Sequence, residues 1–120
     1  MLIAKEWQKT RQLFNKDADN VTGYIYGAKS GVESKSVSKG IVKSIYNTIK
    51  VKYEDNPEFV LINTISISNN NRAISQGGDS GACVLDSDNN VIGLVVAGNT
   101  QVTYVLPITT LLTKLNVQLI

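Results

Sequence analysis

Gln76-Gly77-Gly78-Asp79-Ser80-Gly81-Ala82 is a glycine-rich stretch that lies between two β-rich segments of this 120-residue sequence. A serine held between glycines at a tight turn has an exposed hydroxyl, because glycine allows backbone conformations that other residues avoid. Neighbouring amide N–H groups in such a turn can converge on the point where a substrate carbonyl oxygen becomes negative. The stretch therefore predicts a nucleophile for acyl transfer.

On both sides of this stretch the sequence alternates in the manner of β-strands. The segments are rich in β-branched and aromatic residues and are separated by glycine, asparagine and aspartate turns. The expected strands are residues 21–27, 40–53, 58–68, 82–85, 91–97 and 102–106, the last ended by Pro107. Short antiparallel strands joined by turns predict an all-β fold, a six-stranded antiparallel β-barrel.

Two helices are expected at the ends of the chain. Residues 2–16 have an apolar helical face made of Ile3, Trp7, Thr10 and Phe14. We interpret it as an amphipathic helix that covers one end of the barrel, with docking of Trp7 and Phe14 on a partner as the alternative. Residues 108–115 carry a second apolar face at helical spacing, made of Ile108, Leu111, Leu112 and Leu115.

Length and composition limit the classes of protein that this sequence fits. A chain of 120 residues suffices for one domain, with residues 1–20 as an N-terminal helix and linker and residues 21–120 as the barrel. A net charge of +2 without a basic cluster argues against nucleic-acid and membrane partners. Cys83 is the one cysteine, so no intrachain disulfide forms, and with no signal-peptide core we expect a cytoplasmic protein.

The Gly-Asp-Ser-Gly core resembles the nucleophile motif of chymotrypsin-like (trypsin-like) serine proteases, with Ala82 where secreted members usually carry a second glycine. The order of the expected strands and of the closing helix over residues 21–115 is similar to the C-terminal barrel of that family. The resemblance implies that the fold is the second barrel of a chymotrypsin-like protease.

The resemblance also implies roles for individual residues. Ser80 would be the nucleophile, the amides of Gly78 and Ser80 would form the oxyanion hole, and the turn would be held by Gly77, Asp79 and Gly81. Substrate would be bound by Val96, Ala97, Gly98 and Ile74. Ile74 takes the place of the aspartate that selects basic side chains in trypsin-like members, so a small or apolar preference is expected.

The sequence departs from the family in one decisive respect, because it contains no histidine. A serine hydroxyl without its base loses orders of magnitude in reactivity, and nothing in the sequence directs a lysine to Ser80. The first hypothesis is the C-terminal subunit or fragment of a serine endopeptidase that acts on peptides or proteins. A second chain, or the N-terminal barrel, would then supply His and Asp. The alternative is an inactive pseudoprotease barrel that binds peptides or proteins as a regulatory module.

No metal or cofactor is expected. Residues 86–90 resemble the opening of a calcium loop, but Val91 and Ala97 stand where such a loop needs a glycine and an acidic residue. A solvated hairpin turn is therefore predicted there. Cys83, in an apolar segment, is interpreted as a small buried hydrophobic residue.

Overall fold

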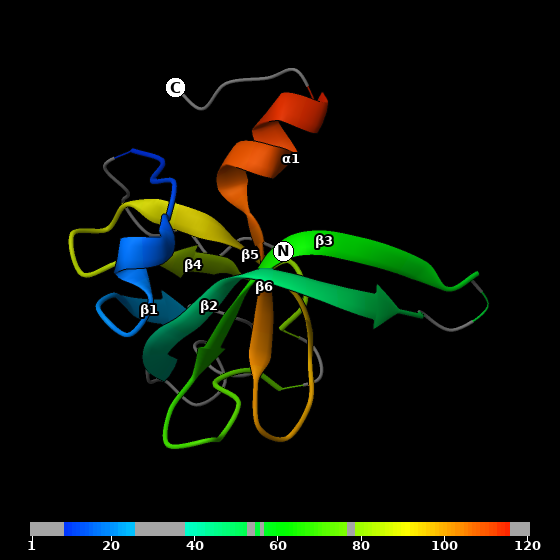
Figure 1. Cartoon of the computed structure of the whole chain (residues 1–120), viewed down its shortest axis with the longest axis horizontal. Helices are drawn as coiled ribbons and strands as arrows, with labels where there is room; N and C mark the ends of the chain where they lie inside the picture. Colours follow the sequence, from blue (N-terminus) through cyan, green and yellow to red (C-terminus); the bar gives the residue numbers. More distant parts are fainter. Residues whose placement is uncertain (1–8, 26–37, 53–54, 56, 77–78, 116–120) are drawn as a thin grey trace.

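The computed structural model describes residues 9–25, 38–52, 55, 57–76 and 79–115 (Figure 1). Within them the chain forms six strands and a short C-terminal helix. In chain order the elements are η1 (Asn15–Asp17), β1 (Thr22–Ile25), β2 (Ser38–Val51), β3 (Phe59–Ser68), β4 (Cys83–Leu85), β5 (Val91–Gly98), β6 (Thr103–Pro107) and α1 (Ile108–Leu115). All six strands predicted from alternation are therefore present, with ends shifted by a few residues, and the closing helix has the predicted bounds.

The strands are joined into a closed ring in the order β1-β2-β3-β6-β5-β4, and every neighbouring pair is antiparallel. The ring closes where Tyr24 and Ile25 of β1 pair with Leu85 and Val84 of β4. Inside it, alternate residues of the strands pack as a core that includes Ile25, Val42, Ile67, Val84 and Val105, all fully buried.

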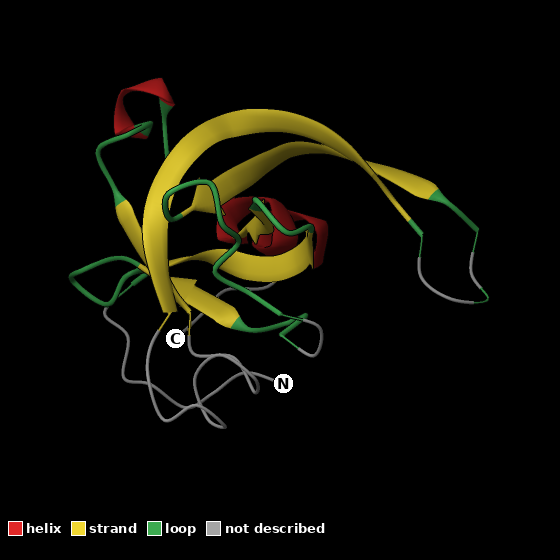
Figure 2. Cartoon of the chain, turned by 90° about the horizontal axis from the view of Figure 1, so that it is seen from below, coloured by secondary structure: helices red, strands yellow, loops and turns green. Residues whose placement is uncertain are grey.

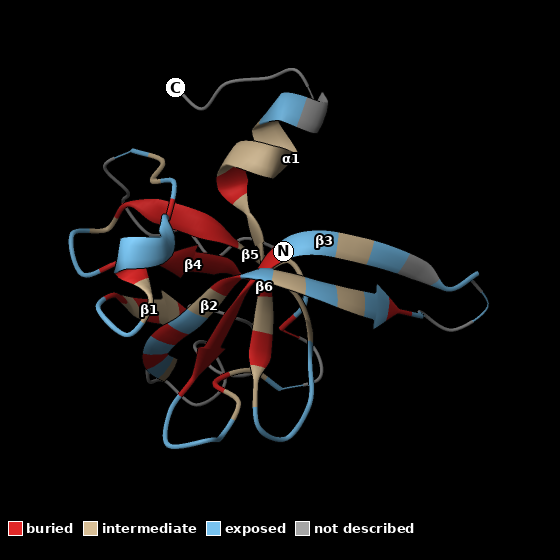
Figure 3. Ribbon diagram, in the orientation of Figure 1, coloured by how far each residue is buried: buried red, intermediate tan, exposed pale blue. Residues whose placement is uncertain are grey.

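β2 and β3 are longer than the ring requires. They stay paired from Ile41–Ser68 to Val51–Phe59, and Figures 1 and 2 both show them running past the ring as a two-stranded arm. Much of the arm is coloured as exposed in Figure 3. Three large apolar residues of the arm are each more than half exposed, namely Tyr46, Val60 and Ile62. The arm consequently adds little to the buried core.

α1 packs against the outside of the ring. Its Ile108 lies in a second apolar cluster with Cys83, Leu85 and Val91, to which Leu111 and Leu112 add their partly buried side chains. These three helix residues belong to the predicted apolar face, and the side chain of its fourth member, Leu115, lies outside what the structure describes. Among the described residues, no helix has the length and apolar character needed to cross a bilayer.

The predicted N-terminal helix over residues 2–16 is wrong in its described part. Thr10 forms a parallel β-bridge with Val91, where the N–H of Arg11 donates to the Val91 carbonyl at 2.8 Å and the Val91 N–H donates to the Lys9 carbonyl at 2.7 Å. The buried backbone groups of Val91, at the start of β5, need hydrogen-bond partners. The N-terminal segment supplies these partners and is therefore extended. Leu13 joins the core, whereas Phe14 is about half exposed. Ile3 and Trp7 lie outside the described residues.

Candidate active site

The loop between β3 and β4 contains the glycine-rich stretch, and a buried carboxylate holds its two ends together. Asp79 is 1% exposed, and its Oδ2 accepts a hydrogen bond from the Gln76 N–H at 2.8 Å. Its backbone N–H donates to the Gln76 carbonyl at 3.0 Å, and its carbonyl accepts from the Ala82 N–H at 2.9 Å. The segment that leads to Ser80 is therefore bent back on itself. Gly77 and Gly78, expected in this turn and in the oxyanion hole, lie outside the described residues.

The residue after the serine attaches this turn to β5. Gly81 has φ of 86°, a left-handed conformation in which a side chain is strained. Its N–H donates to the Val95 carbonyl at 2.8 Å, and the Val95 N–H donates to the Ala82 carbonyl at 2.9 Å. These two bonds place the exposed Ser80 beside the second half of β5.

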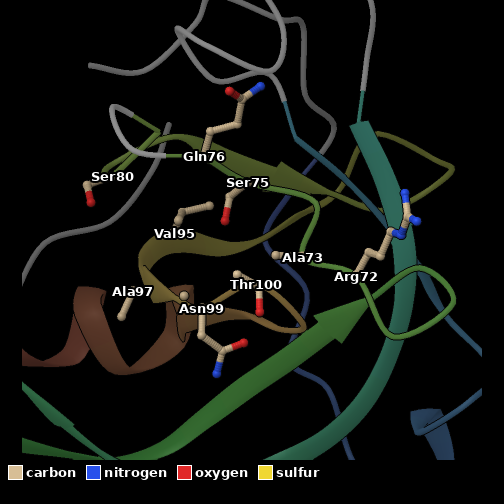
Figure 4. A pocket seen from close by; sticks show the side chains of 10 residues that line it. Arg72, Ala73, Ser75, Gln76, Ser80, Val95, Ala97, Asn99 and Thr100 are labelled. Atoms are coloured by element: carbon tan, nitrogen blue, oxygen red, sulfur yellow. The ribbon is translucent and has the colours of Figure 1, made fainter.

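Ser80 borders a pocket of about 640 Å³ (Figure 4). The pocket is formed by the loop before the serine, the end of β5 and the turn that follows β5. Its lining consists of Arg72, Ala73, Ser75, Gln76, Ser80, Val95, Ala97, Gly98, Asn99 and Thr100. In Figure 4, Ser80 and Arg72 lie at opposite sides of this pocket, with Ser75 between them.

The residues expected to bind substrate divide between the pocket and the fold. Ala97 and Gly98 line the pocket. Val96 is half-buried at a register shift between β5 and β6 and is not part of the lining. Ile74 is 7% exposed and belongs to the core, so its neighbour Ser75 faces the pocket instead.

Ser75 was not identified from the sequence, and its partner explains why. Thr103, at the start of β6, is fully buried, and its Oγ1 accepts hydrogen bonds from the Ile74 N–H at 3.0 Å and the Ser75 N–H at 3.1 Å. The Ser75 and Thr103 hydroxyls are 2.7 Å apart. This contact joins residues 28 positions apart, which no local pattern reveals.

The turn after β5 is ordered by its first residue. Asn99 Oδ1 accepts the backbone N–H groups of Gln101 at 2.8 Å and Val102 at 2.9 Å. The Thr100 carbonyl in turn accepts the Ala73 N–H at 3.2 Å. The two loops that form the far side of the pocket are therefore hydrogen-bonded to each other.

None of the described residues that line the pocket is a lysine, aspartate or glutamate that could serve Ser80 as a general base. The chain contains no histidine. Among the described residues, no three side chains of the His, Cys, Asp and Glu types gather closely enough to hold a metal ion. What the arrangement offers chemically is an exposed hydroxyl next to a polar pocket and a strand end.

Two ionisable groups with shifted pKa values lie outside this pocket. Burial raises the pKa of Cys83 to about 11, which keeps the thiol protonated and unreactive. Burial by itself would also raise the pKa of Asp86, but hydrogen bonds from Asn90, Arg11 and Asp88 outweigh it and lower the pKa below its usual value. The hydrogen bond between Arg11 and Asp86 also raises the pKa of Arg11.

No protein-family model and no curated protein matches this sequence. A search of solved structures finds a glutamic-acid-specific serine protease that uses a histidine triad in substrate binding. The two structures superpose with a TM-score of 0.61 at 18% sequence identity, over 95% of this chain and 55% of that chain. This chain therefore has the fold of a serine protease domain and spans about half the length of that structure.

Proposed function

We propose that this chain is the C-terminal subunit or fragment of a chymotrypsin-like serine endopeptidase. The single observation that carries the proposal is an exposed Ser80, which follows the Asp79-held turn and borders a polar pocket, on a fold that resembles a serine protease. The histidine and aspartate of the triad would come from another chain or from an N-terminal barrel.

In the proposed mechanism, the partner's histidine removes the proton of Ser80 Oγ as the oxygen attacks a peptide carbonyl. The amides of Gly78 and Ser80 stabilise the oxyanion, and the histidine returns the proton to the leaving amine. Water then hydrolyses the acyl-enzyme. This chain contributes the nucleophile, the oxyanion donors and the pocket.

The end of β5 would position the substrate backbone. On one edge of β5, Ala97 and Gly98 pair with Tyr104 and Thr103 of β6. On the other edge, the last pair between β4 and β5 is Cys83–Leu94. Gly81 and Ala82 extend that contact only to Val95. An extended peptide would be added as a strand beside Ala97 and Gly98, which line the pocket.

A second function is favoured by one specific observation: the chain has no histidine, and the described part of the pocket lining offers no other base. In this alternative the domain is an inactive pseudoprotease that captures an extended peptide at the same strand end. The histidine triad of the solved protease has no counterpart here for the same reason, so side-chain selection by this chain must rest on other residues.

A serine-directed fluorophosphonate probe separates the two functions. The purified chain is labelled under three conditions: alone, with added imidazole as an external base, and in extracts of its native cells, where the proposed partner would be present. We expect strong labelling only in the extract, with a smaller gain from imidazole, because both supply the missing base.

Ser80→Ala must abolish this labelling, and Ser87→Ala, which changes an exposed serine in the turn before β5, must leave it intact. A chain that remains unlabelled under all three conditions excludes the endopeptidase and supports the binding module.

A further inference from the structure

We infer that a second pocket, which shares Arg72 with the pocket beside Ser80, binds a phosphate group. Inorganic phosphate and the phosphorylated side chain of a peptide both carry this group, and the experiment distinguishes the two sources. The inference goes beyond the proposed catalysis and does not depend on it, because Ser80 does not line the second pocket.

The second pocket, called the β2 pocket from here on, lies between the start of β2 and the turn that follows β3 and has a volume of about 740 Å³. Its polar lining residues are Ser38, Lys39, Asn69, Asn70 and Arg72. Figure 4 shows the guanidinium of Arg72 directed away from Ser80, at the side where β2 passes (teal). The charge of Arg72 is therefore available to the β2 pocket.

The turn that carries Arg72 is held in place by hydrogen bonds. Asn69 and Arg72 exchange two backbone hydrogen bonds, of 2.9 and 3.0 Å, around Asn70 and Asn71, which have φ of 52° and 61°. The Nδ2 of Asn69 donates to the carbonyl of Lys39 at 3.3 Å and so joins the turn to β2. These bonds place Lys39 and Arg72, which come from segments far apart in the sequence, at one pocket.

The apolar floor of the β2 pocket is closely packed. Ile74 lines the pocket and is 7% exposed. A Cβ at Gly40 would lie 2.9 Å from Ile74 Cγ2 and 2.7 Å from the Ser68 carbonyl oxygen. Because glycine allows this approach of β2, the cations stand above a floor that has little room to move.

Both cations of the β2 pocket lack a partner in the protein. Lys39 and Arg72 are exposed, and within the described residues neither side chain forms a hydrogen bond or an ion pair. The described lining contains no aspartate or glutamate. Two like charges at one pocket repel each other, and an anion bound between them replaces this repulsion by attraction.

The neutral side chains of the lining add hydrogen-bond donors. The hydroxyl of Ser38 and the amide of Asn70 form no hydrogen bond among the described residues, so both can donate to a ligand. A phosphate group carries about two negative charges at pH 7 and at least three acceptor oxygens, and it binds arginine and lysine. A carboxylate would balance one of the two cations. The phosphate group is thus the better match in charge and in acceptors.

The test is a titration followed by the backbone amide NMR signals of Lys39, Asn70 and Arg72. The probes are sodium phosphate and the peptides Ac-Ala-X-Ala-NH2 with X as phosphoserine, glutamate or serine, all at the same ionic strength. We expect inorganic phosphate and the phosphoserine peptide to shift these signals. The glutamate peptide should bind about three-fold more weakly than the phosphoserine peptide, the size of one exposed charge interaction, and the serine peptide should not bind.

The two sources of the phosphate group are distinguished by their order of affinity. Tighter binding of the phosphoserine peptide than of inorganic phosphate assigns the β2 pocket to phosphorylated peptides. Equal or weaker binding of that peptide assigns the pocket to free phosphate. Both orders support a phosphate site.

Variants assign the binding to the two cations. Arg72→Gln and Lys39→Gln should each weaken phosphate about three-fold, and the double variant should weaken it about ten-fold if the two contributions add. Lys50→Gln removes the same charge from an exposed position on the arm, outside the pocket, and should leave the affinity unchanged. Because all three side chains are exposed, the variants should fold, and their amide spectra check this.

The inference is overturned if phosphate and the phosphoserine peptide leave the signals of Lys39, Asn70 and Arg72 unchanged. Binding of the glutamate peptide as tight as that of the phosphoserine peptide, or an equal loss of affinity in Lys50→Gln, also overturns it. Ser80→Ala should bind phosphate as the unaltered chain does. A failure to label Ser80 with the fluorophosphonate therefore refutes the proposed catalysis alone, and a flat phosphate titration refutes the phosphate site alone.

Discussion

At the scale of single residues, the molecule uses buried carboxylates to order its loops. Asp86 is 2% exposed and accepts hydrogen bonds from Arg11 at 2.9 Å, from the backbone N–H groups of Asp88 and Asn90 at 2.9 Å each, and from Asn90 Nδ2 at 3.0 Å. Arg11 also pairs with Asp17 at 3.2 Å. Because Arg11 comes from the extended N-terminal segment, this cluster joins that segment to the turn before β5. The carboxylate of Asp86, the first residue of the stretch that resembles a calcium loop, is thus already bound by donors of the protein itself.

We expect Asp86 to make folding stability depend on acid pH. Its pKa is lower in the folded chain than in the unfolded chain, so its contribution is present above the unfolded value of about 3.9 and is lost as the pH falls through the folded value. The urea concentration at the unfolding midpoint should decrease as the pH is lowered below about 4. Asp86→Asn should flatten this fall, and an equally steep fall in the variant would assign the acid sensitivity to other groups.

At the scale of elements, β5 is the strand that unites the fold and the pocket. It pairs with β4 and β6, accepts the N-terminal segment at Val91, holds the serine turn at Val95, and ends in the pocket at Ala97 and Gly98. Its two glycines have different environments. A Cβ on Gly93 would lie 2.1 Å from the Leu106 carbonyl oxygen, inside the sheet, whereas Gly98 is exposed at the strand end.

The two glycines of β5 should therefore respond differently to the same substitution. Gly93→Ala forces backbone atoms of β5 and β6 apart and should cost about 3 kcal/mol or more in the free energy of unfolding. Gly98→Ala should change it by less than about 1 kcal/mol. Urea denaturation followed by circular dichroism measures both, and comparable losses would mean that β5 and β6 separate more easily than their packing indicates.

At the scale of the whole molecule, the paired outer parts of β2 and β3 extend from a closed ring as an arm that contributes little to the buried core. The ring encloses Ile25, Ile67, Val84 and Val105 with no surface left exposed. The outer part of β2 and β3 exposes Tyr46, Val60 and Ile62 and is stabilised mainly by pairing with itself (Figure 3). An isolated two-stranded hairpin is marginally stable in water. The arm should consequently open by local unfolding while the ring stays folded.

Native-state hydrogen exchange can test this division. We expect the amides of Val84 and Val95 to exchange only through global unfolding, and those of Lys50 and Val60 on the arm to exchange through local opening with a lower free energy. Exchange is measured at two protein concentrations. Equal protection of arm and ring at both concentrations would contradict the prediction, and protection of the arm only at the higher one would reveal self-association through its apolar face.

The amino-acid sequence by itself determined the strands, the closing helix and the serine turn. Their signals are local, since the alternation of residues 58–68, the helical spacing of residues 108–115 and the glycines around Ser80 each lie within one short segment. Tertiary structure decided the rest. Residues 9–14 are extended because Val91 needs backbone partners, and Ser75 borders the pocket because Thr103 on a distant strand binds its N–H and its hydroxyl. Both outcomes depend on hydrogen bonds between residues far apart in the chain, which closing the ring brings together.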